Sequence, residues 1–221
     1  MISVMNMLSA LFSVATLSQL VAASPVQYGC PTQNDVLQLP PSQSQLYVPP
    51  GEKPSHIVLG LGVQNYTCSP TTGLYVSAGA RAALYDISCQ YGTPAFATIT
   101  QDAFVQFNDE DFNLDSPPTA GLVGSYYFTT TESGISPEWD FFSYSSGSSG
   151  FPSFVIGSEV GRIPAPTGFP QDIDWVQWTN IDGGLARTMF QVQTKSGQPP
   201  AYCPAGSPDI SVKYAAQYWL F

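Results

Sequence analysis

The longest apolar run downstream of the N-terminal segment covers residues 57–63, where every second residue is Ile, Leu or Val. Side chains alternate between the two faces of a pleated strand, so this spacing is typical of a strand with one buried face. We therefore predict a β-strand over residues 57–67.

Uninterrupted alternation through this strand has an unfavourable consequence. It would bury Asn65 and Thr67 in the same core as the aliphatic residues and turn Tyr66 away from that core. We expect instead a β-bulge at Gly60 or Gly62, because a residue without Cβ lets the strand kink and exchange its faces.

Short segments rich in β-branched and aromatic residues follow, separated by Gly, Pro, Ser and Asn. The further segments predicted as strands are 80–89, 96–99, 104–107, 121–131, 138–144, 155–163, 173–180, 185–194 and 212–220. In the last of these, one face carries Val212, Tyr214, Ala216, Tyr218 and Leu220. No window keeps a helical period of 3.6. The pattern predicts an all-β fold, a single-domain antiparallel β-sandwich or barrel with long Pro/Gly/Ser-rich loops, one of them at 145–152.

The N-terminus differs from the rest of the chain. Residues 1–23 have a short apolar core followed by small residues, as in a secretory signal peptide, and the run is too interrupted to span a bilayer. Residues 24–52 are rich in Pro and Gln and are expected to form an irregular lead-in, with the β-domain at 53–221. We expect a secreted protein, extracellular or in the cell wall.

Charge excludes some partners. The chain has 16 acidic and 6 basic residues, a net charge of -10, and its cations are scattered. Binding to nucleic acid or to an acidic membrane needs clustered cations, so neither is expected. Charged residues make up only 10% of the chain, against about 25% in a typical domain. A surface built of uncharged polar residues fits a cell-wall polysaccharide or surface glycan as partner, and we expect a monomer.

Four cysteines predict two disulfide bonds in an exported chain. They are Cys30, Cys68, Cys89 and Cys203, and three pairings are possible. No Cys-x-x-Cys occurs and the chain has a single histidine, so neither a zinc site nor another cofactor is expected.

Two carboxylates offer a catalytic alternative. Glu138 and Asp140 flank Trp139 on a predicted strand, which places them on one face about 7 Å apart. Such a pair beside an aromatic ring is typical of an inverting glycoside hydrolase, but alternating polar residues also mark an ordinary solvent-facing strand.

A weak calcium motif is present in the acidic loop near residue 110. Oxygen-bearing side chains alternate there at Asp109, Asp111, Asn113 and Asp115. The glycine and glutamate of an EF-hand are missing, so a solvated loop is favoured over a metal site.

Aromatic residues and one sequon complete the candidate sites. The candidates for ring stacking on a glycan are Trp139, Trp175, Trp178 and Tyr126. Most of these rings are expected to lie in the core, because aromatic side chains bury large apolar areas. Trp175 and Trp178 differ in parity, so one of them should face outward. Asn65 begins the sequence Asn-Tyr-Thr, an acceptor for N-linked glycosylation.

Several of these motifs occur together in a known family. The runs that carry the resemblance are Leu59–Cys68, Leu84–Cys89, Gly124–Phe128, Pro137–Asp140, Gly197–Cys203 and Val212–Phe221. The order of these runs along the chain, from Pro49 to Phe221, resembles that in a family of small exported fungal proteins with bacterial relatives. That family is defined only as a domain of unknown function, and its members are sometimes labelled malate dehydrogenase.

The resemblance implies a β-rich exported domain without established chemistry. It also implies the pairs Cys68–Cys203 and Cys30–Cys89, because the bacterial relatives keep only the first. Tyr126 stands where the family usually has a histidine, so a catalytic role of that histidine does not transfer to this chain.

The dehydrogenase label is rejected on physical grounds. The only Gly-x-Gly run, at residues 60–62, lacks the third glycine of a dinucleotide-binding turn and leads into a strand rather than a helix. His56, the single histidine, has no visible carboxylate partner in the sequence to make it a general base.

No reactive centre is recognisable, so a non-enzymatic role is favoured. The prediction is a binding or structural protein of the wall or cell surface, including one acting at a host interface. The alternative is a secreted polysaccharide hydrolase that uses Glu138 and Asp140.

Overall fold

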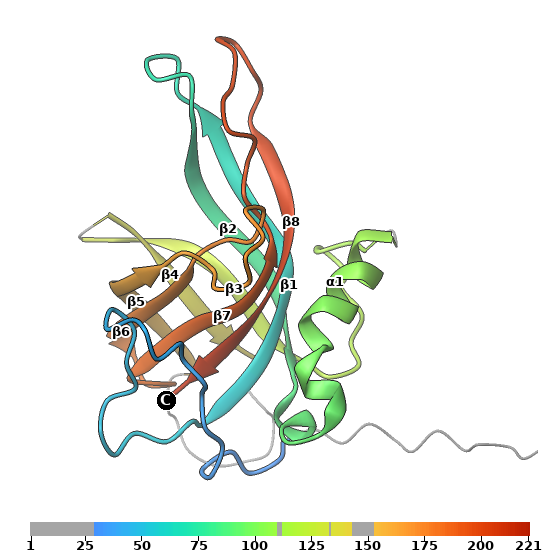
Figure 1. The fold of residues 1–221 in the computed structure, drawn as a ribbon, viewed down its shortest axis with the longest axis vertical. Coiled ribbons are helices and arrows are strands. Elements are labelled where there is room, and N and C mark those ends of the chain that lie inside the picture. Colours follow the sequence, from blue (N-terminus) through green and yellow to red (C-terminus); the bar gives the residue numbers. More distant parts are fainter. Residues whose placement is uncertain (1–28, 110–111, 133, 143–152) are drawn as a thin grey trace, which may run out of the picture.

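The protein forms a closed antiparallel β-barrel in which every strand pairs with its neighbours in the sequence and the last pairs with the first (Figure 1). It was analysed as a computed structural model, which describes residues 29–109, 112–132, 134–142 and 153–221. The strands are β1 (His56–Cys68), β2 (Tyr75–Asp86), β3 (Leu122–Thr131), β4 (Gly134–Phe141), β5 (Phe154–Ile163), β6 (Trp175–Gly183), β7 (Thr188–Ser196) and β8 (Ile210–Leu220). Of the two expected architectures, the barrel is confirmed.

Among the predicted features, the signal peptide at 1–23 and the Ser/Gly loop at 145–152 lie outside the described residues. Within the part of the chain that is described, no helix has the length and apolar character needed to cross a membrane.

The interior of the barrel is filled by side chains. The inward face of β8 carries Tyr214, Ala216, Tyr218 and Leu220, all buried, as its alternation predicts. Opposite them lie the rings of Tyr126 and Trp139, which are 5.1 Å apart between centroids. Because aromatic rings bury large apolar areas, they fill most of the cross-section of an eight-stranded barrel.

A second core lies outside the barrel wall. Ile57, Leu59, Trp175, Phe190 and Trp219 point outward and are nevertheless buried. They are covered by the lead-in and by the short helices that follow β2. Those helices are η1 (Ser88–Gln90), η2 (Pro94–Ala97) and α1 (Ile99–Asp109).

This outer core corrects the prediction for β1. The register with β8 is constant from His56↔Leu220 to Tyr66↔Ile210, so no bulge occurs at Gly60 or Gly62. Ile57, Leu59 and Leu61 belong to the outer core, and Asn65 lies on the same face. The face swap was inferred on the assumption that only one side of the strand is buried, and that assumption was wrong.

Tyr66 accordingly points into the barrel, where its hydroxyl donates to the Gly197 carbonyl at 2.8 Å. The actual irregularity is in the pairing of β1 with β2, between Gln64 and Tyr66. Gly79 lies opposite it with φ of +98°, a conformation that glycine adopts without strain.

The segment after β2 was also predicted wrongly. Strands were expected at 96–99 and 104–107, but η2 and α1 occupy these positions, and Cys89 belongs to η1 rather than to a strand. The buried side of α1 consists of Thr100 and Phe107, supported by half-buried Ile99 and Ala103. This stripe is too short and too polar to give a clear helical period.

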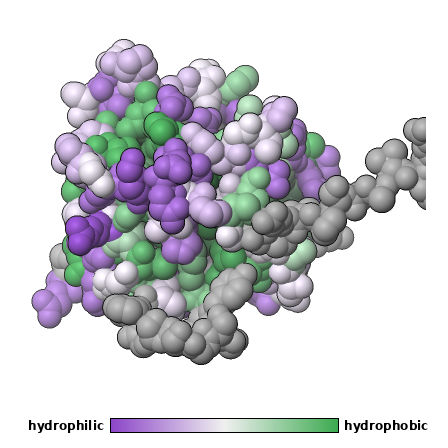
Figure 2. Space-filling view, turned by 90° about the horizontal axis from the view of Figure 1, so that it is seen from below, coloured by the Kyte–Doolittle hydropathy of each residue, from purple (hydrophilic) through white to green (hydrophobic). Residues whose placement is uncertain are grey.

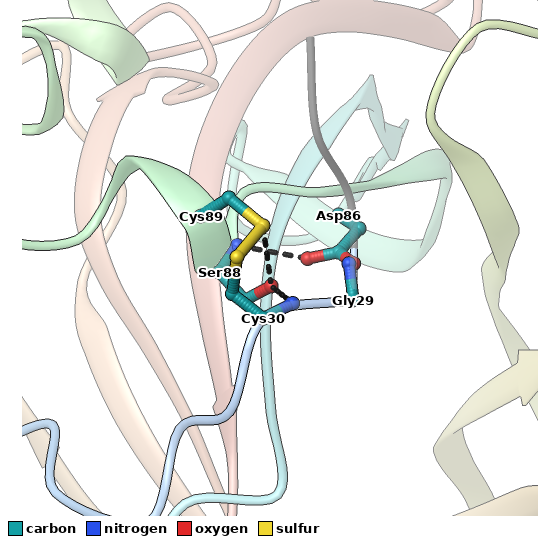
Figure 3. The surroundings of a disulfide bond; sticks show 5 residues. All are labelled: Gly29, Cys30, Asp86, Ser88 and Cys89. Atoms are coloured by element: carbon teal, nitrogen blue, oxygen red, sulfur yellow. Dashed lines mark hydrogen bonds between the residues drawn. A yellow bond between two sulfur atoms is a disulfide. The ribbon is translucent and has the colours of Figure 1, made fainter.

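Both predicted disulfides are present, Cys30–Cys89 and Cys68–Cys203. Cys30–Cys89 fastens the lead-in beside the start of β1, and Figure 3 shows the hydrogen bonds around it. Asp86 accepts from the Gly29 and Ser88 amides at 2.6 and 2.8 Å, while the Ser88 hydroxyl accepts from the Cys30 amide at 3.0 Å.

Cys68–Cys203 lies at the other end, where it joins the tip of β1 to the loop before β8. The C-terminus lies at the end opposite this disulfide (Figure 1). Viewed from that end, hydrophilic and hydrophobic residues are mixed over the surface (Figure 2).

Candidate functional site

A chain of polar groups runs from the barrel interior towards the end where β1 finishes, which we call the mouth. Tyr214 and Tyr218 share a hydrogen bond of 2.8 Å between their hydroxyls, and Tyr218 donates to the Gln191 side-chain oxygen at 3.0 Å. The Gln191 amide in turn donates to the Asp174 carbonyl at 3.0 Å.

Burial raises the pKa of both Tyr214 and Tyr218 above its usual value, so the two hydroxyls remain neutral. The network can therefore position hydrogen bonds but does not supply a reactive phenolate.

A cavity of about 220 Å³ opens at the mouth. Its residues come from β1, β2, β3, β5, β6, β7 and the loops before β6 and after β7. They include Gln64, Tyr66, Tyr126, Phe128, Arg162, Asp174, Trp178, Gln191 and Gln198. The wall thus combines aromatic and aliphatic side chains with amide and charged groups.

Two side chains of this cavity are free to bind a ligand. Among the described residues, the side-chain amides of Gln64 and Gln198 have no hydrogen-bond partner. Each amide offers both donors and an acceptor. Since the two groups are half-buried rather than fully solvated, a ligand that satisfies them gains more than it would at an open surface.

Arg162, the one cation among the described residues that line the cavity, is neutralised by its neighbours. Arg162 donates to both carboxylate oxygens of Glu159, at 2.9 and 2.6 Å, and to Asp174 at 3.3 Å. These carboxylates, Glu159 first, raise the pKa of Arg162 further above its usual value. One positive and two negative charges leave the mouth with no attraction for an anion.

The sequence signature of a family described as "Protein of unknown function (DUF3455)" matches residues 49–221. The chain belongs to the DUF3455 family. No curated protein and no solved structure matches it. The family is the one that the sequence resembles, and the barrel described above is the fold of this DUF3455 domain.

Two of the four aromatic residues predicted to bind a ligand line the mouth of the DUF3455 barrel. They are Tyr126 and Trp178, which are 2% and 5% exposed. Trp139 lies beneath them with no exposure, its ring centroid 5.2 Å from that of Trp178. Trp175 and Trp178 face opposite ways, as their parity predicts. The outward ring, Trp175, is nevertheless buried in the outer core, so neither tryptophan is exposed.

Glu138 and Asp140 lie together on the outer face of β4, on the opposite side of the strand from Trp139. The Tyr127 hydroxyl donates to Glu138 at 3.0 Å and lies 3.4 Å from Asp140. Burial and these two carboxylates raise the pKa of Tyr127. A phenol therefore occupies the space between the carboxylates, and the Trp139 ring is not beside them as a platform for a sugar.

The residues of the weak calcium motif do not converge on one point in the part of the loop that is described. Asp109 ends α1, Asp111 lies outside the described residues, and Asp115 forms an ion pair of 2.6 Å with Arg81. The Asn113 side-chain oxygen accepts from the Asp115 amide at 2.9 Å. The described residues hold no group of three His, Cys, Asp or Glu side chains placed to bind a metal.

Asn65 lies on the outer face of β1 close to the mouth. Its side-chain oxygen accepts a hydrogen bond of 2.7 Å from the Ser211 hydroxyl, and the residue is half-buried. Glycosylation at Asn65 stays a prediction.

Sequence reasoning missed the polar residues of the mouth. Gln64, Arg162, Asp174, Gln191 and Gln198 come from four strands or their flanks and share no sequence motif. In β7, apolar and polar residues do not alternate between the two faces. Met189 and Gln191 face the interior, while Phe190 and Val192 face the outer core. With both faces buried, polarity does not show which side holds the site.

Proposed function

We propose that this DUF3455 domain is a non-catalytic glycan-binding protein that holds a single neutral sugar residue at the mouth of its barrel. The observation that carries the proposal is the pairing of unpartnered Gln64 and Gln198 amides with the aromatic wall of one cavity. Sugars present hydroxyls, which need donors and acceptors, and apolar C–H faces, which pack on aromatic rings.

The volume of the cavity and the charges around it limit the kind of ligand that can bind. Ligand cavities usually measure about 300–1,000 Å³, so the 220 Å³ at the mouth suits one sugar ring, such as a chain end, rather than an oligosaccharide. The paired Arg162 and the net charge of -10 disfavour uronic acids and phosphorylated sugars.

We propose that the domain acts outside the cell. A predicted signal peptide, two disulfides and a surface poor in charge are typical of exported proteins. We propose a cell-wall polysaccharide or a surface glycan, including one of a host, as the natural partner.

The test is an array of neutral and acidic glycans probed with the mature domain. Wild-type protein should bind neutral glycans. Gln64→Ala and Gln198→Ala should each weaken binding about 3- to 10-fold, as expected for loss of one or two neutral hydrogen bonds. Gln101→Ala, on the exposed side of α1, is the matched control and should bind like wild type.

Binding that is unaffected by both mouth variants, or a preference for acidic glycans, would contradict the proposal. The hydrolase alternative is tested by incubating the same protein with the glycans and measuring the reducing sugar that is released. Release that is abolished by Glu138→Gln would establish that alternative instead.

A further inference from the structure

A second cavity lies on the outside of the barrel, between the lead-in and the segment that joins β2 to α1. We call it the outer cavity, and it measures about 350 Å³. Its lining comes from residues 36–38 of the lead-in, from residues 91–97 of the joining segment, and from β7 and β8. None of these residues lines the mouth, so the two cavities are separate sites.

Three aromatic rings form the apolar floor of the outer cavity. Tyr91 and Phe96 are half-buried, and their ring centroids are 5.3 Å apart with the planes at 70°. Trp219 is only 2% exposed, and its ring centroid lies 5.8 Å from that of Tyr91. The first two rings thus keep part of their surface open to a ligand, while the buried indole packs against them.

Two side-chain amides with accessible surface also line the outer cavity. Gln38 and Gln193 are both exposed, and neither side chain has a hydrogen-bond partner among the described residues. Each amide offers donors and an acceptor. They come from two different segments, the lead-in and β7, so a ligand that rests on the rings can be held at two points.

A β-bulge exposes Gln193 beside the rings. The register of β7 with β8 shifts between Val192 and Lys195, and Gln193 has φ of +50°, which is uncommon for a residue with a Cβ. Val192 and Thr194 on either side of it are fully buried. Bulges often re-aim a side chain at a functional site. Here an unfavourable backbone conformation is kept at a residue that carries one of the two free amides.

We propose that the outer cavity binds a segment of a neutral oligosaccharide. Sugar hydroxyls both donate and accept, as the two amides do, and the C–H faces of a sugar ring can pack on Tyr91 and Phe96. None of the described residues in the lining is charged, so an acidic sugar finds no partner there. The volume exceeds the 220 Å³ of the mouth and leaves room for more than one sugar ring.

A proline-rich peptide, another ligand of aromatic grooves, fits this cavity less well. Its backbone carbonyls have no internal hydrogen bonds and need donors beside the rings. The donors of the floor are already engaged. The Trp219 indole donates to the Gln217 side chain at 3.2 Å. The Tyr91 hydroxyl donates to the Val36 carbonyl at 3.3 Å and accepts from the Val36 amide at 3.0 Å.

The two cavities then act together on a polysaccharide, a consequence that rests on the proposed function. The mouth suits a chain end, whereas a cavity on the outside of the barrel can admit a segment within a chain. Two linked sites hold a polymer more tightly than either site alone. Loss of either site should therefore weaken retention on a glycan array.

The test titrates the mature domain with four neutral trisaccharides, laminaritriose, cellotriose, mannotriose and chitotriose, and follows binding by NMR. At least one of them should shift the side-chain amide signals of Gln38 and Gln193 and the indole signal of Trp219. Gln38→Ala should weaken this binding about 3- to 10-fold, as expected for loss of one or two neutral hydrogen bonds. Gln101→Ala, on the exposed side of α1, should bind like wild type.

Gln193→Gly separates binding from folding. Glycine adopts a positive φ without strain, so this variant should unfold at a urea concentration similar to that of wild type. Its affinity for the trisaccharide should nevertheless fall about 3- to 10-fold, because the amide is lost. Gln64→Ala, at the mouth, should leave the shifts of Gln38 and Gln193 unchanged, so the two proposals can fail separately.

Absence of shifts at Gln38 and Gln193 with all four trisaccharides would overturn the inference. So would an affinity that is equal in wild type, Gln38→Ala and Gln193→Gly. Tighter binding of a decaproline peptide, seen at the same amide signals, would assign the outer cavity to a peptide instead.

Discussion

Gly62 shows how closely neighbouring strands approach in this barrel. A Cβ at this position would overlap the carbonyl oxygen of Arg81 and lie 2.6 Å from the Cα of Ala82, both on the paired strand β2. Backbone atoms held in a ladder cannot move aside without breaking its hydrogen bonds, so the position requires a residue without a side chain.

We predict that Gly62→Ala destabilises the domain by about 1–3 kcal/mol, the usual cost of inserting a methyl group into a packed region. The measurement is urea unfolding followed by tryptophan fluorescence. Val63→Ala, the neighbouring and half-buried residue, is the control and should cost about 1 kcal/mol or less. Equal losses in the two variants would show that the strands have room to separate.

The sequence predicts the pairing of cysteines and the side-chain alternation within a strand more reliably than it predicts which faces of the strand are buried. The inward set on β8 and the two cystines were predicted and confirmed. The direction of Tyr66 was predicted wrongly. One of Trp175 and Trp178 was expected on an exposed face, but both are buried, because the lead-in and α1 cover the outside of the wall. Which distant segment covers a face cannot be read from the alternation within one strand.

At the scale of elements, the lead-in covers part of the outside of the barrel wall. Leu46 is buried in the outer core, and the Tyr47 amide donates to the Gln177 side chain on β6 at 2.9 Å. At Gly161 on β5, a Cβ would overlap the carbonyl oxygen of Gln45. The irregular, Pro-rich composition of the lead-in predicts its lack of strands but not this covering role.

We predict that removal of the Cys30–Cys89 bond, by Cys30→Ser with Cys89→Ser, costs about 2–5 kcal/mol. It should also loosen the lead-in and expose the outer core while the barrel stays folded. Binding of the dye ANS under native conditions, together with urea unfolding, measures the two effects.

The matched control for this variant is Cys68→Ser with Cys203→Ser, which releases the mouth end and leaves the lead-in attached. It should lose stability without a comparable rise in ANS binding. If both double variants bind the dye equally, the lead-in is not held by Cys30–Cys89 in the way described.

The helix α1 is the longest element that sequence reasoning missed. Its buried residues Thr100 and Phe107 lie seven positions apart, and Val105 between them is exposed. Phe104 and Phe107 therefore suggested a strand, although tertiary packing against β8 and β1 decides the conformation.

The buried tyrosines make the stability of the whole molecule decrease at alkaline pH. Burial is the main reason that the pKa of Tyr66 is raised to about 12, and the pKa of Tyr126, Tyr214 and Tyr218 is raised as well. In the unfolded chain these phenols ionise near pH 10, whereas in the native barrel they stay protonated. Their contribution to stability is complete below pH 10 and is lost as the pH rises from about 10 towards 12.

We predict that the free energy of unfolding falls above about pH 10 and falls less steeply in Tyr66→Phe. At pH 8 this variant should be less stable by about 0.5–1.5 kcal/mol, because the hydrogen bond to Gly197 is lost. The gap should narrow by pH 11, as urea unfolding at each pH can measure. Parallel curves for the two proteins would contradict an elevated pKa for Tyr66.

The closed barrel also explains why the candidate site could not be found from the sequence. Barrel closure brings Gln64 on β1 into one cavity with Arg162 at the end of β5 and Gln198 after β7. These residues are separated by many strands, and only the strand order and the stagger of the barrel place them together.

The most direct test of the account is an NMR titration of the mature domain with neutral monosaccharides and the corresponding uronic acids. We predict that a neutral sugar shifts the NMR signals of the Gln64 and Gln198 side-chain amides and of the Trp178 indole, and that the corresponding uronic acid binds more weakly. Shifts confined to the Glu138 and Asp140 face of β4, or tighter binding of the uronic acid, would contradict it.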